Sequence, residues 1–142
     1  MQASNETEGP IMTPKIEFTT PPGTMRPVGH YSHIAKVGDW ITIGATAGVD
    51  PATGELAGPG VASQTMQILD AFEVMLATVG SDLDHVVHIH IFLKNMDEFA
   101  SMDAAYAKRM GTRCPARTTV AVVDLPKPRA CVTMNLTAVT SS

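Results

Sequence analysis

The residue with the clearest chemical potential in this chain is an arginine that follows a proline at the start of a predicted strand. Arg117 lies within residues 114–120, whose sequence is CPARTTV. The proline fixes the approach of the backbone, and the planar guanidinium can bind a carboxylate through two parallel hydrogen bonds. The alternative is a surface arginine in a weak ion pair. The segment by itself is compatible with both interpretations.

The histidines and cysteines have spacings that do not favour metal or thiol chemistry. His88 and His90 share one face of a predicted strand, and a pair at this spacing is weak support for a metal site. A strand face at a subunit contact or toward solvent explains both residues, and His85, more simply, although their roles stay open. Cys114 and Cys131 are expected to be free thiols in a reducing cytosol. We predict no metal site.

Hydrophobic periodicity predicts a small mixed sheet that positions Arg117. Strands are expected over residues 31–37, 40–43, 86–93, 118–123 and 130–139, and helices over 61–79 and 97–110. This β-β-α-β-α-β-β order predicts an α+β fold with both helices on one face of the sheet. Strict alternation places Val87 on the apolar face of its strand, and Asp97 is expected to cap the second helix.

Length and composition describe one globular domain. The chain has 142 residues, of which 44% are hydrophobic, so one packed core is expected and two are not. Residues 1–20 are expected to form a flexible N-terminal tail, and residues 21–142 the single domain. Only 17% of residues are charged, below the roughly 25% of a typical soluble domain. The surface is therefore either rich in neutral polar side chains or partly covered by other subunits.

Charge and hydropathy argue against two classes of partner. The net charge is −4 and the isoelectric point about 5.6, and no cluster of Lys and Arg provides a nucleic-acid footprint. No apolar run approaches the roughly 18 residues of a membrane span. The first ten residues have neither the basic nor the apolar region of a signal peptide. We expect a cytoplasmic protein that binds neither nucleic acid nor membranes.

Several collinear motifs add a resemblance to a known family. They are residues 29–32 (GHYS), 50–56 (DPATGEL), 87–94 (VHIHIFLK), 96–99 (MDEF), 115–120 (PARTTV) and 125–127 (LPK). Together they resemble the Rid family, the reactive-intermediate deaminases also called YjgF-like or L-PSP proteins. The resemblance covers about residues 26–139.

The resemblance implies a chorismate-mutase-like subunit that assembles as a homotrimer with clefts at the subunit interfaces. In that family the arginine of the P-A-R motif, here Arg117, binds the carboxylate of a 2-imino or 2-amino-enoic acid. The tyrosine of the G-x-Y-S segment, here Tyr31, lines the same cleft. A glutamate on the last strand of deaminating members activates the attacking water. The products are a 2-oxo acid and ammonia, and neither a metal nor an organic cofactor takes part.

The sequence departs from the family pattern around the expected cleft. The family's glutamate aligns with Thr133 or with Val132, depending on one insertion near Pro128, and neither residue is acidic. The other departures are Gly44, Ala45 and Thr46 in place of S-G-Q, Asp103 in place of an asparagine, His30 in place of a proline, and Thr119 in place of a cysteine. The predicted substrate-binding residues are Arg117, Tyr31, Gly44, Ala45, Thr119 and Thr133.

These departures bear on which residue could activate the water and on whether the protein is an enzyme. A positioned acid–base group contributes about 10²–10⁴-fold in rate, so we hypothesise that His30 or Asp103 activates the attacking water in place of the glutamate. The simpler interpretation of Asp103 is a solvated residue on the surface of its helix. With Arg117, Tyr31 and these residues, the resemblance implies a hydrolytic deaminase of a small carboxylate-bearing enamine or imine, such as a 2-imino acid or an aminomuconate-like intermediate. The alternative is a non-catalytic carboxylate-binding or regulatory trimer. Ribonuclease activity ranks lowest because the acidic chain offers no surface that follows phosphates.

Overall fold

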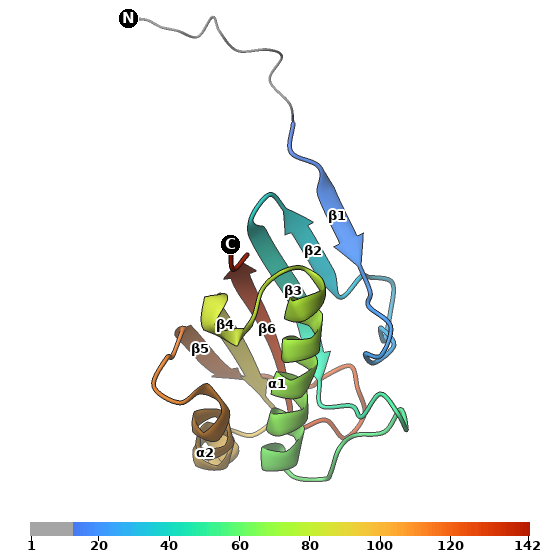
Figure 1. The fold of residues 1–142 in the computed structure, drawn as a ribbon. Coiled ribbons are helices and arrows are strands. Elements are labelled where there is room, and N and C mark those ends of the chain that lie inside the picture. Colours follow the sequence, from blue (N-terminus) through green and yellow to red (C-terminus); the bar gives the residue numbers. More distant parts are fainter. Residues whose placement is uncertain (1–12) are drawn as a thin grey trace, which may run out of the picture.

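The computed structural model describes residues 13–142 as one six-stranded sheet with two helices on one face (Figure 1). The strands are β1 (Ile16–Thr19), β2 (Ile34–Val37), β3 (Trp40–Ala47), β4 (Val86–Leu93), β5 (Ala116–Ala121) and β6 (Val132–Val139). The helices are α1 (Val61–Thr78) and α2 (Phe99–Met110), with short 3-10 helices η2 (Leu83–His85) and η3 (Met96–Glu98). The expected α+β class, with both helices on one face, is confirmed.

The order of strands across the sheet is β1-β2-β3-β6-β4-β5. Strands β4 and β5 run parallel, and α2 lies in the connection between them, while every other neighbouring pair is antiparallel. A parallel pair needs such a crossover, because a tight turn reverses the chain direction. The crossover carries α2 against the face of the sheet on which Arg117 lies.

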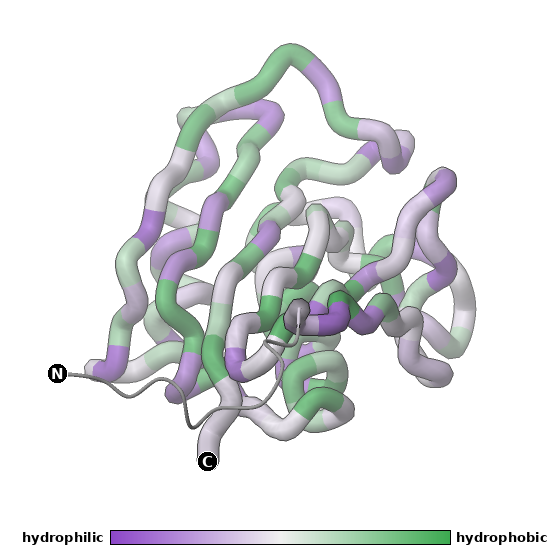
Figure 2. Tube along the Cα trace, turned by 90° about the horizontal axis from the view of Figure 1, so that it is seen from above, coloured by the Kyte–Doolittle hydropathy of each residue, from purple (hydrophilic) through white to green (hydrophobic). Residues whose placement is uncertain are grey.

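The core lies between the helices and the sheet face that they cover. The largest fully buried side chains come mainly from α1, β3 and β4, among them Phe72, Ile41 and Ile89. The alternation of apolar and polar residues along the strands can be followed in Figure 2. This alternation buries one face of β3, β4 and β6 against the helices, as the periodicity predicts.

The chain forms one strand that the sequence did not predict. Ile16–Thr19 forms β1, which pairs with β2 in the register Ile16↔Val37, so the expected tail is wrong for these four residues. The first twelve residues of that expected tail lie outside the described residues. A strand this short carries almost no periodic signal of its own, and it depends on the neighbouring edge for its hydrogen bonds.

Two local predictions at β4 and α2 are also wrong. The register of β4 against β6 shifts between Val86 and His88, so Val86 is buried and Val87 is 43% exposed, the reverse of the expected alternation. Asp97 does not cap α2 with its side chain. It lies inside η3, and its backbone N–H donates to Asn95 Oδ1 at 2.9 Å. The extra 3-10 turn moves the start of α2 to Phe99.

The opposite face of the sheet has no helix on it in the described part of the chain (Figure 1). Strand register places on this open sheet face the residues Ile16, Phe18, Ala35, Val37, Trp40, Thr42, His88, His90, Phe92, Ala116, Thr118, Val120, Thr133, Asn135, Thr137 and Val139. None of them is Asp, Glu, Lys or Arg. Phe18 is 67% exposed and Trp40 is 50% exposed. A sheet face of this size without charges is typical of a surface that another chain covers.

Candidate functional site

Arg117 is held in an ion pair with Asp103. Arg117 comes from β5 and Asp103 from α2, and Arg117 Nη1 donates to Asp103 Oδ1 at 2.7 Å. The side chain of Arg117 is 22% exposed and that of Asp103 46% exposed. Arg117 pairs in register with the buried Ile89, so it lies on the helix-covered face of the sheet. The simpler interpretation expected Asp103 to be only a solvated helix residue, whereas the structure pairs it with Arg117.

Two aromatic rings of α2 fix the plane of the guanidinium. Arg117 Cζ lies 4.9 Å from the centroid of the Tyr106 ring and 5.5 Å from that of Phe99, which is within the range of cation–π attraction. Burial raises the pKa of Tyr106 to about 12, against an opposing effect of the Arg117 charge. Among the described residues the Tyr106 hydroxyl and Thr119 Oγ1 are buried without a hydrogen-bond partner. The arginine thus lies beside polar atoms whose hydrogen-bonding capacity is unused.

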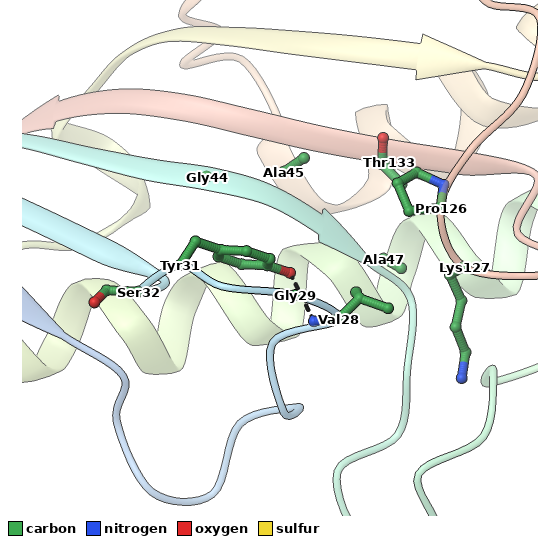
Figure 3. A pocket seen from close by; sticks show the side chains of 10 residues that line it. All are labelled: Val28, Gly29, Tyr31, Ser32, Gly44, Ala45, Ala47, Pro126, Lys127 and Thr133. Carbon is green, nitrogen blue, oxygen red and sulfur yellow. Dashed lines mark hydrogen bonds between the residues drawn. The ribbon is translucent and has the colours of Figure 1, made fainter.

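A second group of predicted residues surrounds a cavity of about 420 Å³ (Figure 3). The residues that line it are Val28, Gly29, Tyr31, Ser32, Gly44, Ala45, Ala47, Pro126, Lys127 and Thr133. They come from β3, from β6, from the loop before β2 and from the loop between β5 and β6. The cavity therefore brings together Tyr31, Gly44, Ala45 and Thr133, four of the predicted substrate-binding residues.

Backbone contacts determine the shape of this cavity. The Val28 N–H donates to the hydroxyl of Tyr31 at 3.0 Å, which folds the loop around the ring (Figure 3). The β3–β6 register is interrupted between Ile43 and Thr46, and such an irregularity turns the backbone at Gly44 and Ala45. Of the two residues considered for the last strand, Thr133 lines the cavity, whereas Val132 belongs to the core with no exposed area.

The fold separates the arginine from the cavity. Arg117 lies on the helix-covered face of β5, while Thr133 pairs with Phe92 on the open sheet face. Strands β4 and β6 stand between β5 and β3 in the sheet. Within one chain, therefore, the structure brings Arg117 together with Asp103 but not with Tyr31 or Thr133.

A comparison with known families shows to which family this chain belongs. Residues 23–140 match the family model described as Endoribonuclease L-PSP. The chain belongs to the L-PSP family, also called RutC, YjgF-like or Rid. A RutC family protein of Pyrococcus horikoshii is 36% identical over 102 residues, which are 72% of this chain and 81% of that protein. A 2-iminobutanoate/2-iminopropanoate deaminase of Dermatophagoides farinae is 27% identical over 116 residues, 82% of this chain and 90% of that protein.

Solved structures of L-PSP proteins show the same fold. The crystal structure of RidA from the Antarctic bacterium Psychrobacter sp. PAMC 21119 superposes with a TM-score of 0.82 at 27% identity, covering 87% of this chain and 98% of that one. The YjgF gene product of E. coli gives a TM-score of 0.81 at 26% identity, with the same two coverages. The expected YjgF-like fold is confirmed.

Two of the L-PSP motifs that carried the resemblance, GHYS and LPK, lie at the cavity. His30 is exposed and lies between two lining residues, Gly29 and Tyr31, without lining the cavity itself. Pro126 and Lys127 line the cavity, although the sequence assigned them no role. The signal for them was the LPK motif, which marked the family without indicating what the loop does.

The histidines and cysteines of this L-PSP chain have simple surroundings. His88 Nε2 lies 3.0 Å from Thr118 Oγ1, and the His88 ring stacks on His90 at 4.3 Å between centroids, both on the open sheet face. A hydrogen bond with His85 lowers the pKa of Asp82. Both cysteines are free thiols, as predicted. Residues 13–142 contain no group of three or more potential metal ligands and no helix long and apolar enough to cross a membrane.

Proposed function

We propose that this protein is a hydrolytic deaminase of small enamines or imines that bear a carboxylate. One observation carries the proposal: Arg117 is held rigidly beside α2, with only one of its nitrogens engaged by a described residue. A guanidinium whose orientation is fixed in this way binds a carboxylate with little further ordering. The similarity to a relative named as a 2-iminobutanoate/2-iminopropanoate deaminase supports the same chemistry.

We infer that the complete site forms between copies of the chain in a homotrimer. The open sheet face carries no Asp, Glu, Lys or Arg, and it exposes large apolar side chains such as Phe18 and Trp40. Covering this face in an assembly also accounts for the low fraction of charged residues, 17%. Arg117 lies on β5, which is an edge strand of the sheet, so Arg117 of one copy can reach the cavity around Tyr31 and Thr133 of a neighbour, which a single chain does not allow.

The reaction requires a bound carboxylate, an electrophilic carbon and one water. Arg117 holds the carboxylate, and this fixes the imine carbon relative to the cavity. An enamine first takes a proton at carbon and becomes the imine. The water oxygen then bonds to the imine carbon, the carbon–nitrogen bond breaks, and the products are a 2-oxo acid and ammonia. One proton of the water passes to the nitrogen, and the hydroxyls of Tyr31 and Thr133 can accept hydrogen bonds from the attacking water and so orient it.

The absence of an acidic or imidazole side chain from the described cavity lining favours a second candidate. The charged residue that lines the cavity is Lys127, and no Asp, Glu or His of residues 13–142 lines it. A cavity of this kind can bind a small carboxylate without turning it over. The second candidate function is therefore a non-catalytic trimer that keeps Arg117 as a carboxylate receptor.

Ammonia release separates the two candidates. We would generate 2-iminopropanoate or an aminomuconate in situ and measure ammonia with the wild-type protein, with Arg117→Ala and with the control Arg113→Ala. Arg113 is exposed; it makes a long ion pair of 3.6 Å with the Asp84 side chain, and its Nη2 donates to the Asp84 carbonyl at 3.1 Å. The deaminase predicts acceleration that Arg117→Ala abolishes and Arg113→Ala retains. Wild-type rates equal to the uncatalysed rate on both substrates would establish the binding protein instead.

A further inference from the structure

The guanidinium of Arg117 is already engaged by a carboxylate of the same chain. Nη1 donates to Asp103 Oδ1 at 2.7 Å, and the ionised pair carries no net charge. Among residues 13–142, Nε and Nη2 of Arg117 and Oδ2 of Asp103 have no hydrogen-bond partner. The pair therefore presents two donors and one anionic acceptor next to one another.

This arrangement is complementary to a ligand with charges of both signs. Building on the deaminase function above, we propose that Asp103 makes the site selective for ligands with both a carboxylate and a cationic nitrogen, so that the substrate is bound as its 2-iminium form. The ligand carboxylate accepts from Nε and Nη2 of Arg117 as a bidentate pair. The adjacent nitrogen donates to Oδ2 of Asp103. Neither contact breaks the existing Arg117–Asp103 hydrogen bond.

A plain carboxylate fits the same site poorly. It reaches Arg117 only beside the negative charge of Asp103, and like charges at close range repel. Water screens part of this repulsion, because the Asp103 side chain is 46% exposed. A cationic nitrogen on the ligand replaces the repulsion with a charge-assisted hydrogen bond. Asp103 thus acts as a specificity-determining residue for the site.

The same contacts distinguish the substrate from the product. The bound species R–C(=NH2+)–COO− accepts the water oxygen at its iminium carbon, and the carbon–nitrogen bond then breaks to give R–CO–COO− and NH4+. The 2-oxo acid has lost its N–H donors and turns a carbonyl oxygen toward the Asp103 carboxylate. Two acceptors then face each other, and this repulsion favours product release.

The test compares two ligands of matched size on the full-length protein. Equilibrium binding of 2-aminobutanoate, which has an ammonium group, and of butanoate, which has none, is measured at neutral pH by calorimetry. The variants are Asp103→Asn and the control Asp70→Asn. Asp70 also accepts a hydrogen bond from an arginine, Arg109, but it lies on α1. Wild-type protein should prefer 2-aminobutanoate by at least about tenfold, which corresponds to one charge-assisted hydrogen bond.

The variants have distinct expected results. Asp103→Asn should lower the preference for 2-aminobutanoate by about tenfold and strengthen binding of butanoate, whereas Asp70→Asn should leave both affinities unchanged. An unchanged preference in Asp103→Asn, or a wild-type preference for butanoate, overturns the assignment of Asp103 and leaves the proposed function intact. Failure of both ligands to bind the wild-type protein overturns the carboxylate receptor at Arg117, and with it the proposed function and this inference.

Discussion

Replacing Gln64 with leucine tests how the fold holds Cys131, which comes directly before β6 and two residues before Thr133. Gln64 lies on α1 with no exposed area. Its Nε2 donates to the Gly58 carbonyl at 2.8 Å, and its Oε1 accepts from the Cys131 N–H, also at 2.8 Å. One side chain thus satisfies two backbone groups, one in the loop before α1 and one next to β6. Gln64→Leu keeps the volume of the side chain but leaves both groups without a partner.

The expected cost follows from these two hydrogen bonds. Leaving a buried polar group unsatisfied costs about 1–3 kcal/mol, and the added burial of leucine returns about 1 kcal/mol. Two such groups, less this return, give an expected fall in the free energy of unfolding of about 1–5 kcal/mol, centred near 3 kcal/mol. With a urea dependence of about 1–3 kcal/mol per molar, the unfolding midpoint should fall by about 1–3 M. Protein concentration must be fixed, because assembly raises apparent stability.

Gln67→Leu is the matched control for this measurement. Gln67 lies one turn further along α1, is partly exposed, and makes no side-chain hydrogen bond with the described residues. Gln67→Leu should change the free energy of unfolding by less than about 0.5 kcal/mol. Equal midpoints for Gln64→Leu and Gln67→Leu would refute the role of Gln64 in holding β6.

Three further predictions address packing, assembly and the surroundings of Arg117. Gly48→Ala places a Cβ 2.5 Å from the backbone oxygen of Gln64, so urea unfolding should show a loss of about 1–3 kcal/mol in the free energy of unfolding. No loss would contradict the close approach of Gly48, the residue after β3, to α1. Thr137→Asp adds a charge to the centre of the open sheet face, and light scattering should detect monomers where the wild-type protein forms trimers. The chain has 2 tyrosines, so Tyr31→Phe leaves Tyr106 as the one tyrosine that titrates. Burial favours the neutral phenol, so the tyrosinate absorbance of this variant should rise with a pH midpoint near 12 rather than 10.0. A midpoint near 10.0 would show that Tyr106 is solvated.

The sequence predicts the regular elements of this fold well, because they carry strong periodic signals. Helix α1 and strand β4 agree with their expected ranges to within about one residue. Strand β1 could not be found in this way, because its pairing partner β2 stabilises it. The irregular register before His88 was equally hidden, since alternation in the sequence does not reveal an extra residue in one of two paired strands.

The candidate site could be predicted only in its parts. Arg117 and Tyr31 were found from motifs. Arg117 forms a hydrogen bond with Asp103, and Tyr31 lines the cavity. The contact between Arg117 and Asp103 depends on the crossover that carries α2 against β5, which is a property of the topology and not of either segment. Lys127 was missed as a lining residue, because the shape of its loop depends on packing against β3 and β6.

Mixed assemblies of two inactive variants test the claim that Arg117 of one copy completes the cavity of another. Arg117→Ala removes the carboxylate receptor, and Ala45→Trp fills the cavity while leaving Arg117 intact. Each variant alone should release no ammonia above the uncatalysed rate. Co-expression of the two with different tags yields assemblies whose composition mass spectrometry verifies.

In randomly mixed trimers about a quarter of the sites combine an intact cavity with an intact Arg117 from the neighbouring copy. We therefore predict that mixing two inactive variants restores about a quarter of the wild-type rate of ammonia release. Verified mixed trimers without activity, while wild-type trimers are active, would contradict the claim.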